Sequence, residues 1–230
     1  MAENRFAISS RWGLVSLLLL CFLGVWVVAS DLDRRELRTS DEESYYQIPA
    51  EQMRPFLMGY DLIAADFFWL ETIQYLGRHL LGDQKFPYLY PRLQRIVSLD
   101  PHFVDVYRLG GLFLAYSAGQ VDEAIRLLQR GAALNPDRWE PAHDLGILYY
   151  LKKKDYPQSL YWLQRADRLP GRPGYVSRFV ARLYASTGQR EVAIEMWIRI
   201  YHQTDLSWVR DIARRELEKL GIHLPPERGR

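Results

Sequence analysis

A tripeptide, Leu-Gln-Arg, occurs three times in this chain, and each occurrence begins 35 residues after the previous one, at Leu93, Leu128 and Leu163. Three leucines and three helix-breaking residues keep the same interval: Leu99, Leu134 and Leu169, then Pro101, Pro136 and Gly171. An interval of this length is typical of stacked helical hairpins. Because one hairpin cannot bury its apolar face alone, the interval predicts an all-α array in which each hairpin covers the next.

The segment from residue 110 to residue 136, GGLFLAYSAGQVDEAIRLLQRGAALNP, resembles the tetratricopeptide repeat (TPR) family. The resemblance implies small residues where the two helices of a hairpin touch, and glycine in the turn between them. These roles fall to Gly111, Gly119, Ala124 and Gly131, and in later blocks to Gly146, Ser159, Ala166, Ala181, Gly188 and Ala193. Two blocks are one residue longer than the usual repeat of about 34, and the segment KKKDY has no glycine, so irregular turns are expected.

The repeat pattern predicts a TPR-like α-solenoid over residues 49–220. Its hairpins are expected at about 59–101, 102–136, 137–171 and 172–204, followed by a capping helix at 205–220 and a flexible tail at 221–230. The capping helix has one apolar stripe and charged residues elsewhere. This pattern suits the end of an array, where the outer face meets water.

The stretch from Phe56 to Gly77, FLMGYDLIAADFFWLETIQYLG, is apolar on nearly every side but contains Asp61 and Asp66. Each aspartate would cost about 2.5–3.5 kcal/mol near the centre of a bilayer, which disfavours a membrane span. We expect instead the first helix of the array, covered by its hairpin partner, by the next hairpin and by a short helix near residues 49–57. The stretch is also similar to the opening segment of certain membrane-anchored bacterial repeat proteins. For Asp66, a structural role is favoured over a catalytic one.

An uncharged run from Trp12 to Ser30 precedes the repeats. Its 19 residues would rise roughly 28 Å as a helix, enough to cross a hydrocarbon core. We predict a transmembrane anchor at 12–30, with a cleaved signal peptide as the alternative because small residues end the run. Arg5 and Arg11 favour a cytoplasmic tail at 1–11 and a periplasmic repeat domain. The segment 31–48 is polar and dense in both charge signs, which predicts a solvated tether. The expected location is therefore the inner membrane, in single-pass topology.

Composition and motifs argue against several classes of function. The chain has 30 basic and 28 acidic residues, so no overall positive field indicates nucleic-acid binding. Its one cysteine is Cys21, and its five histidines never fall at metal-ligand spacing, so no metal site is expected. No phosphate loop or nucleophile–base motif is present. The sequence therefore predicts neither an enzyme nor a cofactor.

TPR-like arrays bind partners along a concave groove lined by the first helix of each hairpin. Arginine and tyrosine are enriched at binding hot spots, and Tyr175, Arg178 and Arg182 share one helix face by their spacing. The predicted groove residues are Arg108, His143, Tyr150, Tyr175, Arg178 and Arg182. A groove of this character suits an extended peptide or a helix with acidic groups.

The anchor and the repeats together lead to the hypothesis of a membrane-anchored scaffold or adaptor that holds a protein or peptide partner in envelope complex assembly or secretion. Two alternatives remain open. The chain could be a structural subunit of a membrane complex that acts through its anchor. It could also be an accessory factor of an envelope hydrolase or glycan-processing system.

Overall fold

The structure is a computed structural model that describes residues 19–27 and 50–224. The chain divides into two compact units, residues 1–48 and 49–230, and each is described here by itself. In the first unit, residues 19–27 are helical. Most of the predicted anchor at 12–30 lies outside the described residues, as do the tail at 1–11 and the tether at 31–48. Among the helices that the structure describes, none is both long enough and apolar enough to cross a membrane.

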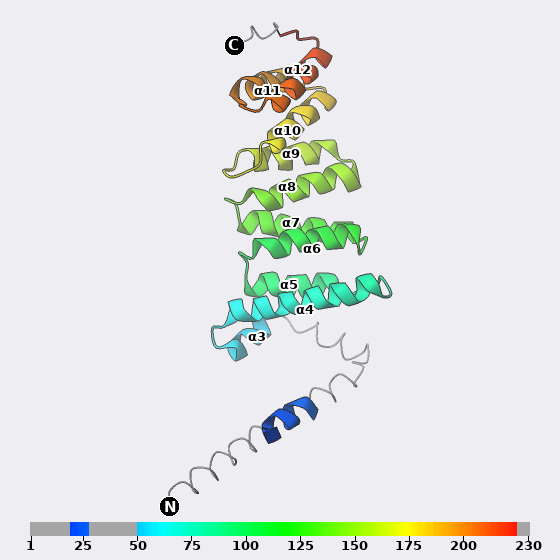
Figure 1. Cartoon of the computed structure of the whole chain (residues 1–230), viewed down its shortest axis with the longest axis vertical. Helices are drawn as coiled ribbons and strands as arrows, with labels where there is room; N and C mark the ends of the chain where they lie inside the picture. The colour runs from blue at the N-terminus through cyan, green and yellow to red at the C-terminus, as the bar shows by residue number, and fades with distance from the viewer. Residues whose placement is uncertain (1–18, 28–49, 225–230) are drawn as a thin grey trace, which may run out of the picture. The chain divides into compact units, whose positions relative to one another are not determined.

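Within residues 50–224, every regular element is a helix, and consecutive helices pair as antiparallel hairpins (Figure 1). The pairs are α4 with α5, α6 with α7, α8 with α9, and α10 with α11, while α12 packs on α11. The bounds are α3 (Ala50–Leu57), α4 (Asp61–Leu81), α5 (Leu89–Leu99), α6 (Val104–Tyr116), α7 (Val121–Leu134), α8 (Trp139–Leu148), the π-helix η1 (Tyr149–Lys153), α9 (Tyr156–Asp167), α10 (Tyr175–Ser186), α11 (Arg190–Gln203) and α12 (Ser207–Lys219). The predicted all-α, TPR-like stack of hairpins is confirmed.

Glycines let the two helices of a hairpin approach closely. A Cβ on Gly111 of α6 would lie 2.9 Å from Cγ of Leu128 on α7, and one on Gly146 of α8 would lie 2.6 Å from Cγ of Leu163 on α9. Such separations are far below the ordinary contact distance of carbon atoms. Leucine therefore fills the space that the missing side chain leaves, and the same contact recurs one repeat later.

The core is divided among clusters along the stack. The largest cluster runs from α3 to α8 and includes Tyr107 and Leu128. A second joins α9 to α10 around Leu163, and a third joins α10, α11 and α12 around Trp197. Each cluster is built from neighbouring hairpins, as expected for a fold in which a repeat contacts only the repeats beside it.

The turn after α8 is irregular, as the absence of glycine from KKKDY predicts. The π-helix η1 ends α8, and Lys154 then adopts a left-handed backbone with a φ of 56°. The side chain of Asp155 accepts a hydrogen bond of 3.0 Å from the backbone N–H of Gln158 and so caps α9. Lys154 takes the left-handed position that Gly119 and Gly188, with φ of 69° and 82°, take in the turns after α6 and α10.

The prediction that α4 is covered all round is wrong, although its hairpin partner α5 and the short α3 do pack on it. Its buried side, which includes Phe68, Tyr75 and Leu76, packs mainly on α5. The opposite side carries Leu62, Ile63, Phe67, Leu70 and Leu81, which are between 59% and 93% exposed. The physical reason is position: α4 belongs to the first hairpin, and within the described residues only the short α3 packs on it from the preceding chain.

Candidate binding face

The first helices of the hairpins present one continuous row of side chains. Because the repeat interval is 35 residues, Arg108 of α6, His143 of α8 and Arg178 of α10 occupy the same register position. We call this surface the first-helix face, and its exposed or half-buried members are Leu70, Ile73 and Leu81 of α4, Asp105, Arg108, Leu109, Leu112 and Tyr116 of α6, His143, Asp144, Ile147 and Leu151 of α8 and η1, and Tyr175, Arg178, Phe179 and Arg182 of α10. The face is apolar over α4, carries both apolar and charged side chains over α6 and α8, and becomes basic towards α10.

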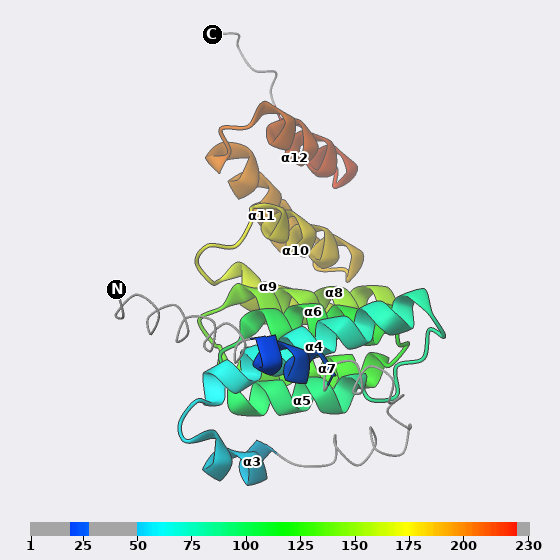
Figure 2. The same cartoon turned by 60° about the horizontal axis from the view of Figure 1, so that its bottom comes forward.

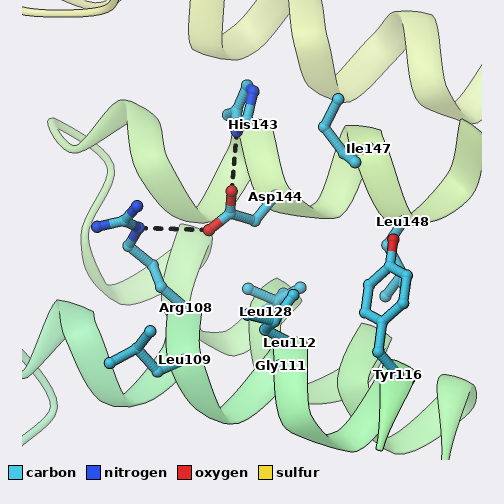
Figure 3. Close-up of a pocket in the computed structure, with 10 residues that line it drawn as sticks. All are labelled: Arg108, Leu109, Gly111, Leu112, Tyr116, Leu128, His143, Asp144, Ile147 and Leu148. Atoms are coloured by element: carbon cyan, nitrogen blue, oxygen red, sulfur yellow. Dashed lines mark hydrogen bonds and ion pairs between the residues drawn. The ribbon is translucent and has the colours of Figure 1, made fainter. Parts of the chain in front are cut away.

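A cavity of about 190 Å³ opens on this face between α6 and α8 (Figure 3). One end holds the charged and polar groups of Arg108, His143 and Asp144, and Tyr116 lies at the other end. Apolar atoms dominate the wall between them, where Leu112 and Ile147 face each other across the two helices. A cavity of about 150 Å³ can hold benzene, so this one has room for one large apolar side chain.

Asp144 is held by two donors at the polar end of the cavity. Nε of Arg108 donates to Oδ2 at 3.3 Å, and Nδ1 of His143 lies 2.8 Å from Oδ1 (Figure 3). Nε2 of His143 lies 3.1 Å from the hydroxyl of Tyr175 on α10. A neutral imidazole with its proton on Nδ1 satisfies both contacts, because it donates to the carboxylate and accepts from the phenol. The network thus links α6, α8 and α10.

The α10 end of the face has a different electrostatic character. Burial raises the pKa of Tyr175, and the negative charge of Asp144 adds to the rise, while Arg108 opposes it. Burial lowers the pKa of Arg178, and the positive charge of Arg182 lowers it further. The guanidinium of Arg178 stacks 5.1 Å from the ring of Trp208, and Arg182 pairs with Glu216 at 3.3 Å. Two adjacent cations therefore define a basic region.

The structure brings five of the six predicted groove residues to the first-helix face. Arg108, His143 and Tyr175 belong to one hydrogen-bonded network, while Arg178 and Arg182 form the basic region. Tyr150 instead packs between hairpins, with its ring 4.9 Å from that of Phe179 and 5.4 Å from that of Tyr156. A binding role for any of these side chains stays a prediction.

The sequence reasoning missed the apolar members of the face and Asp144. Leu109, Leu112 and Tyr116 are between 42% and 51% exposed, and Leu151 is 44% exposed. The repeat interval could have found them, since Leu112 matches Ile147 and Tyr116 matches Leu151 at an offset of 35. The enrichment of arginine and tyrosine at binding hot spots does not point to these leucines, and it does not account for the omission of Tyr116.

A second hollow lies beside the start of α6. Asp66 lines it together with Asp100, His102, Asp105 and Arg138. Among the residues that the structure describes, no group of three acidic, histidine or cysteine side chains is placed to hold a metal ion. Asp66 thus lies on the side of α4 that faces α6, at a polar surface.

The order and pairing of the helices define a TPR-like helical repeat protein, a class of fold that presents extended surfaces to protein partners. No family model matches the chain, and no curated protein matches it. Among solved structures, one described as the crystal structure of MamA protein shares 19% identity and a TM-score of 0.46, over 68% of this chain and 89% of that one. A second structure of MamA shares 21% identity and a TM-score of 0.40, over 57% and 81%. A structure of Naa15/Naa10 bound to HypK-THB shares 16% identity and a TM-score of 0.45, over 71% and 26%.

Proposed function

We propose that this protein is a membrane-anchored adaptor whose first-helix face binds a segment of another protein. The observation that carries the proposal is the cavity between α6 and α8, which combines an apolar wall with the Arg108–Asp144–His143 network at one end. Interfaces concentrate their binding energy where a large side chain fills a desolvated pocket. The adaptor has no catalytic role in this proposal and needs no cofactor.

The expected partner segment is an amphipathic helix or an extended peptide. One large apolar side chain would fill the cavity, and its neighbours would rest on Leu109, Leu112 and Leu151. Acidic groups one to two turns further along would approach Arg178 and Arg182. The placement of apolar and basic regions along the face therefore favours one direction of binding over the other.

The proposed anchor is the uncharged run at 12–30, with the repeat array on the periplasmic side of the inner membrane. Support for this part comes from the length of the run and from Arg5 and Arg11 before it. An array held there could bring envelope proteins together during complex assembly or secretion. Resistance of the full-length chain to extraction by alkaline carbonate tests the anchor by itself.

Site-specific photo-crosslinking in the source cells tests the binding face. A photoreactive amino acid replaces Leu112, on the wall of the cavity, in the full-length chain. The matched control carries the same group at Tyr161 of α9, which is 57% exposed on a second helix. We expect a discrete crosslinked protein from position 112 and none from position 161, and loss of that band when Leu109 is changed to serine.

Equal crosslinking from both positions, or none from position 112, would contradict the proposed face. Replacing 12–30 by an unrelated apolar span of the same length separates an adaptor from a subunit that acts through its anchor. An adaptor keeps its crosslink after this replacement, whereas a subunit recognised through its own span loses its function.

A further inference from the structure

Six large apolar side chains project from the end of α3, the loop after it and the first two turns of α4. They are Phe56, Met58, Tyr60, Leu62, Ile63 and Phe67, and their exposed fractions lie between 61% and 84%. We call this surface the α3–α4 corner. Monomeric soluble proteins rarely gather so many exposed apolar side chains in one place. Figures 1 and 2 show the corner at the edge of the array opposite α12.

The backbone holds the corner outward. Met58 and Gly59 both have positive φ, 50° and 87°, and the N–H of Tyr60 donates to the carbonyl of Leu57 at 2.8 Å. A methionine with positive φ is strained, because its Cβ crowds the backbone. Phe56 at the end of α3 is 82% exposed, and Met58 in this tight turn is 84% exposed.

The charged residues next to the corner are turned to other partners. Asp61 lies 3.9 Å from Nε of Arg54 on α3. Asp66 lines the polar hollow with His102 and Arg138, on the side of α4 that faces α6. Asp61 is thus paired with a cation, and Asp66 belongs to a polar hollow that also holds Asp100 and Asp105.

We infer that the α3–α4 corner rests in the interfacial layer of the membrane and so fixes the orientation of the array on the bilayer. The inference rests on the proposed anchor at 12–30. Nineteen residues, 31–49, separate that run from α3, and they span at most roughly 65 Å. Of the described array, α3 is the part nearest to the proposed span along the chain, and Phe56 follows its first residue by six positions. Aromatic and aliphatic side chains on a projecting edge are the type that enters the lipid headgroup layer.

A second copy of the chain fits the corner less well. A projecting apolar loop needs a matching apolar hollow on its partner. The apolar cavity lies between α6 and α8, and the hollow beside α4 is lined mainly by charged and polar side chains. Contact between two different patches is heterologous and leaves both patches open for further copies, so it does not close into a dimer. A fluid lipid surface needs no matching hollow.

The single cysteine of the sequence allows a direct test. Cys21→Ser gives a full-length chain without thiols, and Met58→Cys then takes an environment-sensitive fluorophore at the corner. The protein is reconstituted in vesicles of equal parts phosphatidylethanolamine and phosphatidylglycerol, with and without nitroxide-labelled lipid. A matched control carries the fluorophore at Glu191→Cys, an exposed position on α11.

We expect blue-shifted emission at position 58 that nitroxide lipid quenches, and neither effect at position 191. Phe56→Ser combined with Ile63→Ser should reduce the quenching at least about threefold, because the buried apolar area falls. Leu206→Ser, a change of the same kind at an exposed site before α12, should leave the quenching unchanged.

Three other outcomes are distinguishable. A chain that does not float with the vesicles contradicts the anchor of the proposed function. A chain that floats with an unquenched fluorophore at position 58 leaves the anchor in place and overturns the corner inference. A blue shift that nitroxide lipid does not quench, and that grows with protein concentration, overturns the corner inference in favour of a second copy of the chain.

Discussion

At the residue scale, close contacts between helices make particular side chains indispensable. Gly131 of α7 faces the ring of Tyr107, and a Cβ there would lie 2.7 Å from the ring carbon Cγ. Tyr107 is fully buried, and its hydroxyl donates to the carbonyl of Pro101 at 3.1 Å. Small and large residues are therefore matched across each hairpin, so that adding or removing one methyl group disturbs the packing of the two helices.

Gly146→Ala should destabilise the repeat unit 49–230 by about 1–3 kcal/mol through overpacking. The added Cβ would meet Cγ of Leu163 at 2.6 Å and its backbone nitrogen at 3.1 Å, and a backbone atom cannot rotate away. Gly77→Ala on α4 is the matched control, because its Cβ would meet nothing within 4 Å. Helix propensity alone should then stabilise the control by up to about 1 kcal/mol. Urea unfolding measures both, and equal shifts of the same sign would contradict this account.

Tyr107 should make the array sensitive to alkaline pH. Burial raises the pKa of Tyr107 to about 12, although the charge of Arg130 opposes the rise. Because the folded value lies above the unfolded value of about 10, the stabilisation is complete below pH 10 and is lost as pH rises towards 12. Urea unfolding should show that the free energy of unfolding is roughly 1 kcal/mol lower at pH 11 than at pH 8 because of this group. Tyr107→Phe should lack this part of the loss, and a variant with the same alkaline loss as the parent chain would contradict the assignment.

At the element scale, the arginines of the second and third Leu-Gln-Arg tripeptides connect the second helix of one hairpin to the second helix of the hairpin before it. Arg130 of α7 donates to the side-chain oxygen of Gln94 on α5 at 2.7 Å and to Oγ of Ser98 at 3.2 Å. Arg165 of α9 donates to the carbonyl of Ala132 on α7 at 2.7 Å. In the first hairpin, Arg95 lies under α4, with its guanidinium 5.2 Å from the ring of Phe68. The repeated arginine thus fixes successive hairpins in one register.

Arg130→Met should weaken the contact between the first and second hairpins by about 1–2 kcal/mol, since it removes hydrogen bonds from a charged donor but keeps the length of the side chain. Hydrogen exchange should accelerate in α5 and leave α10 to α12 unchanged. Arg199→Met, at an exposed position on α11, is the matched control and should change neither region. Faster exchange throughout the array would indicate general destabilisation instead.

The constant interval made the hairpins and their small residues predictable, because a fixed repeat forces the same contact, such as Gly111 on Leu128, to recur. The exposure of α4 was not predictable, since burial depends on what lies beside a helix and not on its own pattern. The placement of Tyr150 was missed for a different reason. At an offset of 35, Tyr150 matches Ala115, which is buried, so the repeat register itself places Tyr150 between hairpins.

The Asp144 network was equally hidden from the sequence. His143 and Asp144 are neighbours in the chain, and helical spacing does not predict that their side chains form a hydrogen bond with each other. Arg108 and Tyr175 complete the network from α6 and α10, which the repeat interval brings to either side of α8. Polar partners of this kind depend on side-chain rotamers as well as on register, and the sequence predicts only the register.

At the scale of the repeat array, stability should be local, because the core clusters follow the order of the hairpins. Trp197 of α11 is fully buried with Ala213 and Leu217 of α12, and Trp197→Ala should cost about 3–5 kcal/mol in that cluster. Hydrogen exchange should then rise in α10 to α12 while α4 to α7, which share none of these contacts, keep their protection. Leu206→Ser serves as the control, because Leu206 is exposed and directly precedes α12. Uniform loss of protection from α4 to α12 would mean that the array folds as one cooperative body and that its ends cannot adapt independently to a partner and to a membrane.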